Sequence, residues 1–375
     1  MSALRRWLGV TALALAGGLV ACSSTPSRPA PTPLAELKPQ FQPRQVWRVE
    51  VGAIHAPLLT AVKGDQVAVA SSQGTLAVID AATGQERWRL ALGSPVVAGV
   101  GGDGERFAVI TANQQLVVAE AGRVLWRAPL AAVSYTPPLV AGGRVFVLTA
   151  DRVVTAFDGS QGRRLWSQGR TTDPLVLRQP GLLMAYGDSL LAGLSGRMVA
   201  MSPDNGSVRW DVAIGTSRGV NEIERLVDVV AGVYREGSTL CARAFQSAVT
   251  CVDGRRAVAL WTRNSQGYVG VAGDNQNIYG VESDGKVLAW ARSSGEPVWT
   301  HEGLRFRGLT APLQVGGSVV VGDEQGVVHW LAAATGQLQS RTVPDGSAIA
   351  SPPVLAGKTL VVVTAKGSVS AYRAD

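Results

Sequence analysis

The chain has 375 residues, of which 46% are hydrophobic, 17% are charged and 44 are glycine. This is ample to bury a core and excludes a compact single-layer domain. The formal net charge is +7 without a run of lysine or arginine, which argues against a nucleic-acid-binding protein. Many glycines and valines favour strands joined by tight turns over helices.

The chain begins with the pattern of an export signal. Two arginines precede an apolar run, Trp7 to Val20, which is too short to span a bilayer as a stable helix and is typical of a signal peptide. The run ends in Leu-Val-Ala-Cys, which resembles the lipobox of bacterial lipoproteins. The resemblance implies a signal peptide over 1–21 and acylation of Cys22, which would anchor the protein in a membrane. Ser23 follows where aspartate would indicate inner-membrane retention, so the implied location is the outer membrane, on its periplasmic side. The alternative is an ordinary signal peptide with an incidental cysteine.

Residues 23–44 carry six prolines and no strand pattern. This composition predicts an extended tether with polyproline character, which spans up to about 3.1 Å per residue. We therefore expect three parts: the signal peptide, the acylated cysteine with its tether over 22–44, and one folded domain over 45–375.

Tryptophan recurs at a nearly constant interval through the rest of the chain. Seven tryptophans are 41, 38, 40, 44, 51 and 38 residues apart, and Ser340 occupies an eighth position 41 residues after the last. They are Trp47, Trp88, Trp126, Trp166, Trp210, Trp261 and Trp299. Each interval holds four short apolar strand patterns separated by glycine turns, which is the length and content of a propeller blade.

The repeat predicts an all-β, eight-bladed β-propeller of four-stranded antiparallel blades. Seven full blades span 52–346, and the remaining C-terminal residues supply three strands. The strand pattern at 45–51 has no partners before it, so we expect it to complete the last blade and to hide both free edges. Each tryptophan is predicted to pack between adjacent blades and to cover the neighbouring turn, where Asp80, Asp158 and Asp253 cap their own turns.

Two cysteines remain after Cys22. Cys241 and Cys251 lie in two apolar runs around a short polar turn near Gln246. In a hairpin they would lie opposite each other on neighbouring strands, at a spacing that a disulfide can bridge. The alternative, a reactive redox pair, lacks the Cys-x-x-Cys spacing. We therefore expect a structural disulfide.

Three repeats resemble the PQQ-type propeller blade, whose family includes quinoprotein dehydrogenases; they lie at 78–88, 156–166 and 200–210. Quinoproteins of this type carry a Cys-Cys pair and calcium ligands, but this chain has no Cys-Cys pair. His55, His301 and His329 are widely spaced and show no metal-ligand pattern. We expect no catalytic residue, no cofactor and no metal. A PQQ-dependent periplasmic quinoprotein and a ligand-binding propeller are the alternatives. A sugar-binding propeller would cluster its aromatic residues on loops, whereas most of these tryptophans fall in strand patterns.

The signal, the lipobox, the proline-rich tether and the eight blades together resemble the BamB family, the lipoproteins of the outer-membrane β-barrel assembly machinery. The resemblance covers essentially the whole mature chain. It implies a non-catalytic scaffold that binds the POTRA domains of BamA, the barrel-forming subunit, and aids the folding and insertion of outer-membrane proteins. Unfolded outer-membrane proteins are further candidate partners.

Two stretches carry this resemblance most closely. "PLVLRQPG" at 174–181 is similar to the family's Leu-x-Leu-Arg segment, and "NEIERLVDVV" at 221–230 is similar to its E-I-[DE]-R-L-x-D-V-D segment. Val230 departs from the last acid of that pattern. The implied partner-binding residues are Leu175, Leu177, Arg178, Glu222, Arg225 and Asp228.

The lengths of the repeats point to the same region without the resemblance. The intervals of 44 and 51 residues are the longest, and their extra length follows Trp166 and Trp210. Enlarged neighbouring loops on a rigid scaffold are where binding is usually found. The alternatives are that the leucines only cover a blade edge, and that Arg225 and Asp228 pair with each other.

Overall fold

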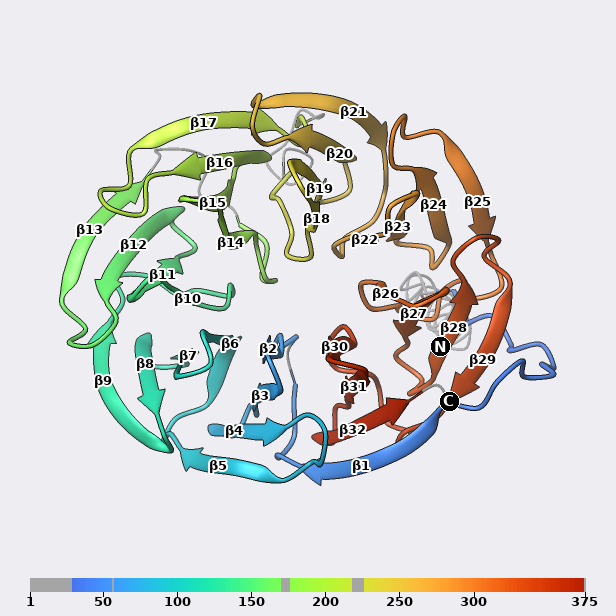
Figure 1. Ribbon diagram of the computed structural model, residues 1–375, viewed down its shortest axis with the longest axis horizontal. Helices are drawn as coiled ribbons and strands as arrows, with labels where there is room; N and C mark the ends of the chain where they lie inside the picture. Colours follow the sequence, from blue (N-terminus) through green and yellow to red (C-terminus); the bar gives the residue numbers. More distant parts are fainter. Residues whose placement is uncertain (1–28, 56, 170–175, 218–225, 374–375) are drawn as a thin grey trace, which may run out of the picture. The chain divides into compact units, whose positions relative to one another are not determined.

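The computed structural model describes residues 29–55, 57–169, 176–217 and 226–373. The chain divides into two units, Met1–Pro31 and Thr32–Asp375, and the second holds the described strands. These 32 strands form eight sheets of four, arranged in a ring (Figure 1). Among the described residues, no helix is long and apolar enough to cross a membrane.

Seven blades follow one another along the chain, each with its strands in sequence order. Blades one and two are β2 (Ala61–Lys63), β3 (Gln66–Ala70), β4 (Thr75–Asp80) and β5 (Glu86–Ala91), then β6 (Val96–Gly102), β7 (Arg106–Thr111), β8 (Gln115–Glu120) and β9 (Arg123–Pro129). Blades three and four are β10 (Leu139–Ala141), β11 (Arg144–Leu148), β12 (Val153–Asp158) and β13 (Arg164–Gly169), then β14 (Leu183–Tyr186), β15 (Ser189–Leu194), β16 (Arg197–Met201) and β17 (Val208–Ala213). Blades five and six are β18 (Tyr234–Glu236), β19 (Thr239–Ala244), β20 (Ala248–Asp253) and β21 (Val258–Asn264), then β22 (Ala272–Gly273), β23 (Asn277–Val281), β24 (Val287–Ala291) and β25 (Pro297–His301). Blade seven is β26 (Leu313–Val315), β27 (Ser318–Gly322), β28 (Val328–Ala332) and β29 (Leu338–Thr342).

The eighth blade joins the two ends of the folded unit. Its strands are β30 (Val354–Ala356), β31 (Thr359–Val363), β32 (Ser368–Arg373) and β1 (Arg44–Glu50), and β1 is the outermost. Figure 1 shows β1 lying beside β32, with which it pairs in antiparallel fashion. The eight-bladed propeller predicted from the sequence, with its N-terminal strand in the C-terminal blade, is confirmed.

The alternation of strands gives the ring two distinct faces. Because every blade is an antiparallel meander, the links between consecutive blades emerge on one face together with the turns between second and third strands. We call this the connection face. The turns between first and second strands, and between third and fourth strands, emerge on the opposite face.

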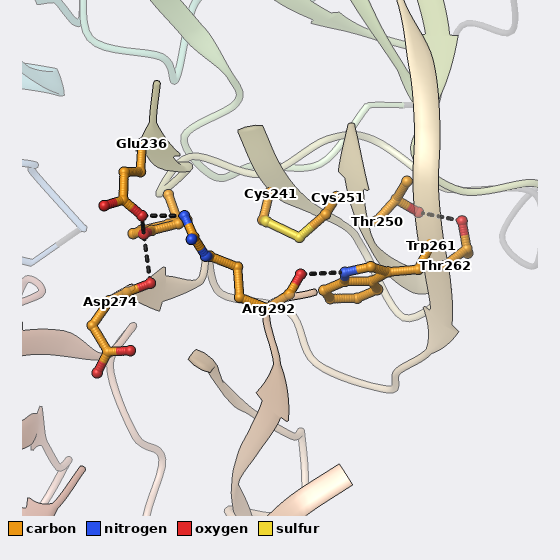
Figure 2. The surroundings of a disulfide bond; sticks show 9 residues. Glu236, Cys241, Thr250, Cys251, Trp261, Thr262, Asp274 and Arg292 are labelled. Carbon is orange, nitrogen blue, oxygen red and sulfur yellow. Dashed lines mark hydrogen bonds and ion pairs between the residues drawn. A yellow bond between two sulfur atoms is a disulfide. The ribbon is translucent and has the colours of Figure 1, made fainter. Parts of the chain in front are cut away.

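Five of the register tryptophans form hydrogen bonds between adjacent blades. The indole Nε1 of Trp126 donates a hydrogen bond of 2.9 Å to the carbonyl of Gly159, in the next blade's turn. Four others donate to equivalent turn carbonyls: Trp47 to Ala81, Trp166 to Pro203, Trp261 to Arg292 and Trp299 to Ala333. Figure 2 shows the bond from Trp261 to Arg292. The rings also lie against turn glycines, because a Cβ on Gly162 would come within 2.6 Å of the Trp126 ring.

Aspartates in three of these turns bond to the turns themselves. The Asp80 carboxylate accepts the amides of Ala82 and Thr83, and Asp158 and Asp253 accept amides of their own turns in the same way. Hydrogen bonds from Arg87 and Thr83 lower the pKa of Asp80 to about 2. These carboxylates therefore stabilise turns within the described blades.

A disulfide joins Cys241 of β19 to Cys251 of β20 (Figure 2). The two residues are directly opposite each other in the antiparallel register, and Gln246 lies in the intervening turn with φ of 44°. Both cysteines are completely buried within blade five. The bond therefore links the two central strands of one blade.

The segment 32–43, which we call the strap, lies against the outer edge of β29. The amide of Gln40 donates to the carbonyl of Gln339 at 2.9 Å, and the Ser340 hydroxyl donates to the carbonyl of Phe41 at 2.8 Å. The Phe41 ring meets Trp330 edge-on, with centroids 6.4 Å apart. Ser340 occupies the eighth register position, so Phe41 supplies an aromatic ring beside the outer strand that lacks its tryptophan.

The strap shortens the free length of the expected tether. The sequence predicts a tether that extends to residue 44, but the folded unit begins at Thr32. The Thr32 amide donates to the Arg305 carbonyl at 3.0 Å, and Arg307 donates to the Thr32 carbonyl at 3.0 Å. Proline content predicts extended backbone, and here an extended backbone packs on a neighbouring strand.

Candidate partner-binding site

The six predicted partner-binding residues belong to two links between blades. Leu175, Glu222 and Arg225 lie outside the described residues, as does the proposed lipidation residue Cys22. Leu177 and Arg178 lie in the link from β13 to β14, and Asp228 lies in the link from β17 to β18. Both links emerge on the connection face.

The described parts of these links are hydrogen-bonded to each other. The Leu182 amide donates to the carbonyl of Val229 at 3.1 Å, and the Ala231 amide donates to the carbonyl of Pro180 at 2.9 Å. Gly181 and Val230 are paired as an antiparallel bridge. The two segments singled out from the sequence therefore form one continuous surface.

The Asp228 side chain connects the two links. One carboxylate oxygen accepts the backbone amide of Leu177 at 3.2 Å, and the other accepts Arg152 Nη2 at 3.1 Å. The side chains of Arg152 and Asp228 are only 10% and 18% exposed. Since both oxygens are engaged, Asp228 positions the Leu177 backbone.

Arg178 is exposed and rests over an aromatic ring. Its guanidinium carbon lies 5.8 Å from the ring centroid of Tyr135, which belongs to the link from β9 to β10. This distance is within the range of a cation–π contact. Half-buried Leu177 helps to line a small cavity of about 50 Å³ beside it, together with Tyr135, Arg152 and Asp228.

Val230 lies between this cavity and a second, axial one. The axial pocket measures about 170 Å³ and is lined by links from around the ring, including Leu59, Pro180, Tyr268 and Ala311. Val230 lines both cavities and is only 2% exposed. The departure from the family acid at this position therefore places an apolar side chain where the two cavities meet.

Arg152 and Tyr135 were not singled out from the sequence. Arg152 lies in the turn between β11 and β12 with φ of 61°, a conformation that favours glycine. The corresponding turn positions in other blades include Gly74, Gly285 and Gly326, all with positive φ. An arginine at a position where these sister repeats carry glycine, and blade two carries Gln114 with φ of 57°, is the sequence signal that points to Arg152.

No metal centre accompanies this surface. Within the described residues, no group of three or more histidine, cysteine, aspartate or glutamate side chains is arranged to hold a metal ion. His329 and Asp323 are both fully buried in blade seven. The Asp323 carboxylate lies 2.9 Å from His329 Nε2 and accepts a hydrogen bond of 2.6 Å from Arg307 Nε. Since a carboxylate only accepts, Nε2 carries the proton. This buried cluster adjoins the strap through Arg307.

Comparison with known families identifies the chain. A family model described as "Outer membrane protein assembly factor BamB" matches residues 41–99, 93–301 and 303–375. The chain belongs to the BamB family. It is 37% identical over 379 residues to the BamB of Burkholderia pseudomallei, and the match covers 100% of both chains. It is 30% identical over 375 residues to the BamB of Pseudomonas aeruginosa, covering 98% of this chain and 99% of that one.

Solved structures agree with the fold. The BamB crystal structure from Moraxella catarrhalis superposes with a TM-score of 0.81 at 24% identity, covering 88% of this chain and 100% of that one. Quinohemoprotein alcohol dehydrogenase from Comamonas testosteroni superposes with a TM-score of 0.69 at 12% identity, covering 88% and 76%. The second match reflects a shared propeller fold alone. Membership of the BamB family makes this chain an outer membrane protein assembly factor, not an enzyme, and associates it with the outer membrane.

Proposed function

We propose that this protein is a scaffold of the outer-membrane β-barrel assembly machinery that binds the POTRA region of BamA through its connection face. One observation carries the proposal: Asp228, in the link from β17 to β18, accepts the backbone amide of Leu177 in the link from β13 to β14, next to exposed Arg178. By holding a POTRA domain in place, the propeller aids the folding and insertion of outer-membrane proteins. Unfolded outer-membrane proteins are a second class of partner.

The chemistry of the surface suits a protein interface. Arg178 presents a guanidinium that is fixed over Tyr135, and arginine and tyrosine are enriched among residues that dominate binding energy. Leu177 adds apolar area beside it, whereas the carboxylate of Asp228 is already engaged within the protein. Arg178 and Leu177 therefore contact the partner, and Asp228 acts as a positioning residue. Leu175, Glu222 and Arg225 extend the proposed contact surface.

The proposed location follows from the sequence of the N-terminus. Residues 1–21 form a signal peptide, Cys22 carries the lipid, and the residues before the strap form the tether to the outer membrane. The propeller then faces the periplasm.

A capture experiment tests the interface. The periplasmic domains of BamA from the same organism are incubated with this protein lacking its lipid, and with Arg178→Ala and Arg123→Ala variants of unchanged melting temperature. Arg123 is equally an exposed arginine but follows a turn on the opposite face, so it serves as the matched control. Capture by wild type and Arg123→Ala, with loss in Arg178→Ala, is expected. Equal capture by all three moves the site elsewhere, and capture by none contradicts the proposed function.

A further inference from the structure

The joint between blades four and five departs from its sister joints. Four residues before each register position, six turns of the repeat carry a glycine with φ between 70° and 78°: Gly84, Gly122, Gly162, Gly206, Gly295 and Gly336. Blade five has Ala257 there, with φ of 56°. A left-handed alanine is strained, and Ala257 carries this strain at the position where six sister turns carry glycine, although the turn of blade two also holds a left-handed alanine, Ala121, one residue before its glycine.

The tryptophan at this joint is also different. Within the described residues, Trp210 donates no hydrogen bond to the turn of blade five and Trp88 donates none to that of blade two, whereas Trp166 and Trp261 at the neighbouring joints do. Tyr186 approaches that turn instead, because a Cβ on Gly254 would lie 2.7 Å from the tyrosine hydroxyl. The joint therefore stays open on the opposite face, and a cleft of about 440 Å³ forms there.

Guanidinium groups surround this cleft. Arg235 stacks over the Tyr186 ring at 4.9 Å, and Arg209 is held by Asp188 at 2.7 Å and Ser189 at 2.9 Å. Arg255 is exposed at the turn next to them. The charged residues lining the cleft are three arginines and one aspartate, Asp188, so the lining has an excess of positive charge. Two of the guanidiniums are already fixed in place by their neighbours.

We propose that this cleft binds an acidic segment of an unfolded polypeptide. Guanidinium forks match carboxylates in a two-bond geometry, which recommends arginine over lysine for this purpose. The Trp210 ring, which also lines the cleft, offers contact to the side chains beside the carboxylate, and a small inorganic anion would leave most of the cleft empty. This inference rests on the proposed function, in which unfolded outer-membrane proteins are a second class of partner. The cleft and the BamA surface lie on opposite faces, so the two bind independently.

The test uses a fluorescein-labelled peptide of alternating glutamate and tyrosine, with fluorescence anisotropy as the readout. Arg255→Gln and Arg235→Gln are each expected to weaken binding roughly tenfold, since a hydrogen bond between charged groups is lost. Arg256→Gln is the matched control, because Arg256 is exposed in the same turn but does not line the cleft. It should bind as wild type does.

The opposing outcomes are distinct. Equal weakening by Arg256→Gln would mean attraction to general surface charge and would overturn the site. Displacement of the peptide by an equal concentration of inorganic phosphate would overturn the assignment to polypeptide. Absence of binding by wild type would overturn the proposal altogether. Because Arg255→Gln should still capture the BamA periplasmic domains, failure here is distinguishable from failure of the proposed interface.

Discussion

The carboxylate of Asp228 and the guanidinium of Arg152 form an ion pair of 3.1 Å, although the residues are 76 positions apart in the sequence. The pair connects the turn between β11 and β12 with the link between β17 and β18. Both side chains are largely buried, so the pair is screened less by salt than a surface pair. It holds Asp228 in position, and Asp228 in turn holds the backbone of Leu177 in the proposed BamA surface.

Replacing Asp228 by asparagine should destabilise the protein by roughly 1–3 kcal/mol, because the ion pair between Asp228 and Arg152 is lost in a largely buried place. Urea unfolding measures this, and BamA capture should fall with it as Leu177 loosens. Asp204→Asn is the control, since its pair with Arg144 is 2.8 Å long but Asp204 is 70% exposed. An equal effect of both substitutions would contradict the positioning role.

Phe41→Ala should lower the free energy of unfolding by roughly 1–3 kcal/mol, because the half-buried ring packs against Trp330 at the outer strand without a tryptophan. Thermal melting of the unlipidated protein detects the loss. The neighbouring exposed Gln42→Ala should have little effect. If Phe41→Ala melts like wild type, the strap does not stabilise the ring.

Ala257→Gly should stabilise the protein by about 1 kcal/mol, because it relieves a left-handed alanine. The reciprocal change, Gly162→Ala, should destabilise it by more than that, because φ is 71° and the added Cβ would meet the Trp126 ring at 2.6 Å. If the two turns are equivalent, urea unfolding should show changes of opposite sign in the free energy of unfolding of the two variants. The same sign for both would mean that they are not.

Stability should fall as the pH drops below about 6.5. Burial, the largest cause, lowers the pKa of His329, and burial also lowers the pKa of His301. Between each lowered pKa and the ordinary value, the unfolded chain binds a proton that the folded chain does not, so stability is lost on acidification. Although burial opposes ionisation of Asp323, hydrogen bonds led by that from His329 keep its pKa below 3.8, so its contribution is lost only at lower pH.

His329→Gln should therefore reduce the slope of unfolding free energy between pH 5 and 7. The measurement is urea unfolding across that range, with His55→Gln at an exposed position as the control. An unchanged slope in His329→Gln would show that the buried imidazole does not cause the acid sensitivity.

Cys22→Ser should release the protein from membranes. Wild type expressed in a Gram-negative host should incorporate labelled palmitate and sediment with the outer membrane, because acyl chains give firm anchoring. The variant should do neither, while the purified propeller keeps its melting temperature. Palmitate labelling that persists in Cys22→Ser would remove Cys22 as the lipidation residue.

The fold was predictable because its period is visible in single residues. A tryptophan at one place in most blades reveals blade length, and the isolated strand around Trp47 reveals how the ring closes. The partner-binding segments were predicted in part from their extra length. What the period does not reveal is which links touch, and Asp228 was expected to pair with nearby Arg225 as one alternative, whereas Arg152 is its described partner.

The strap was missed for a different physical reason. Proline-rich composition indicates extended backbone but not whether that backbone is free. The missing tryptophan at Ser340 was visible in the sequence, as was Phe41. Only the fold places them side by side, because they are 299 positions apart in the sequence.

The point at which the strap begins has a mechanical consequence. Thr32 is held by the link between β25 and β26, which emerges on the connection face with the proposed BamA surface. With a lipid on Cys22, roughly ten residues reach that point, and a fully extended chain of that length spans at most about 35 Å. The proposed anchor on Cys22 would then limit how far the proposed BamA-binding face can turn away from the bilayer. Lengthening the segment between Cys22 and Thr32 would allow this rotation without changing any surface of the propeller.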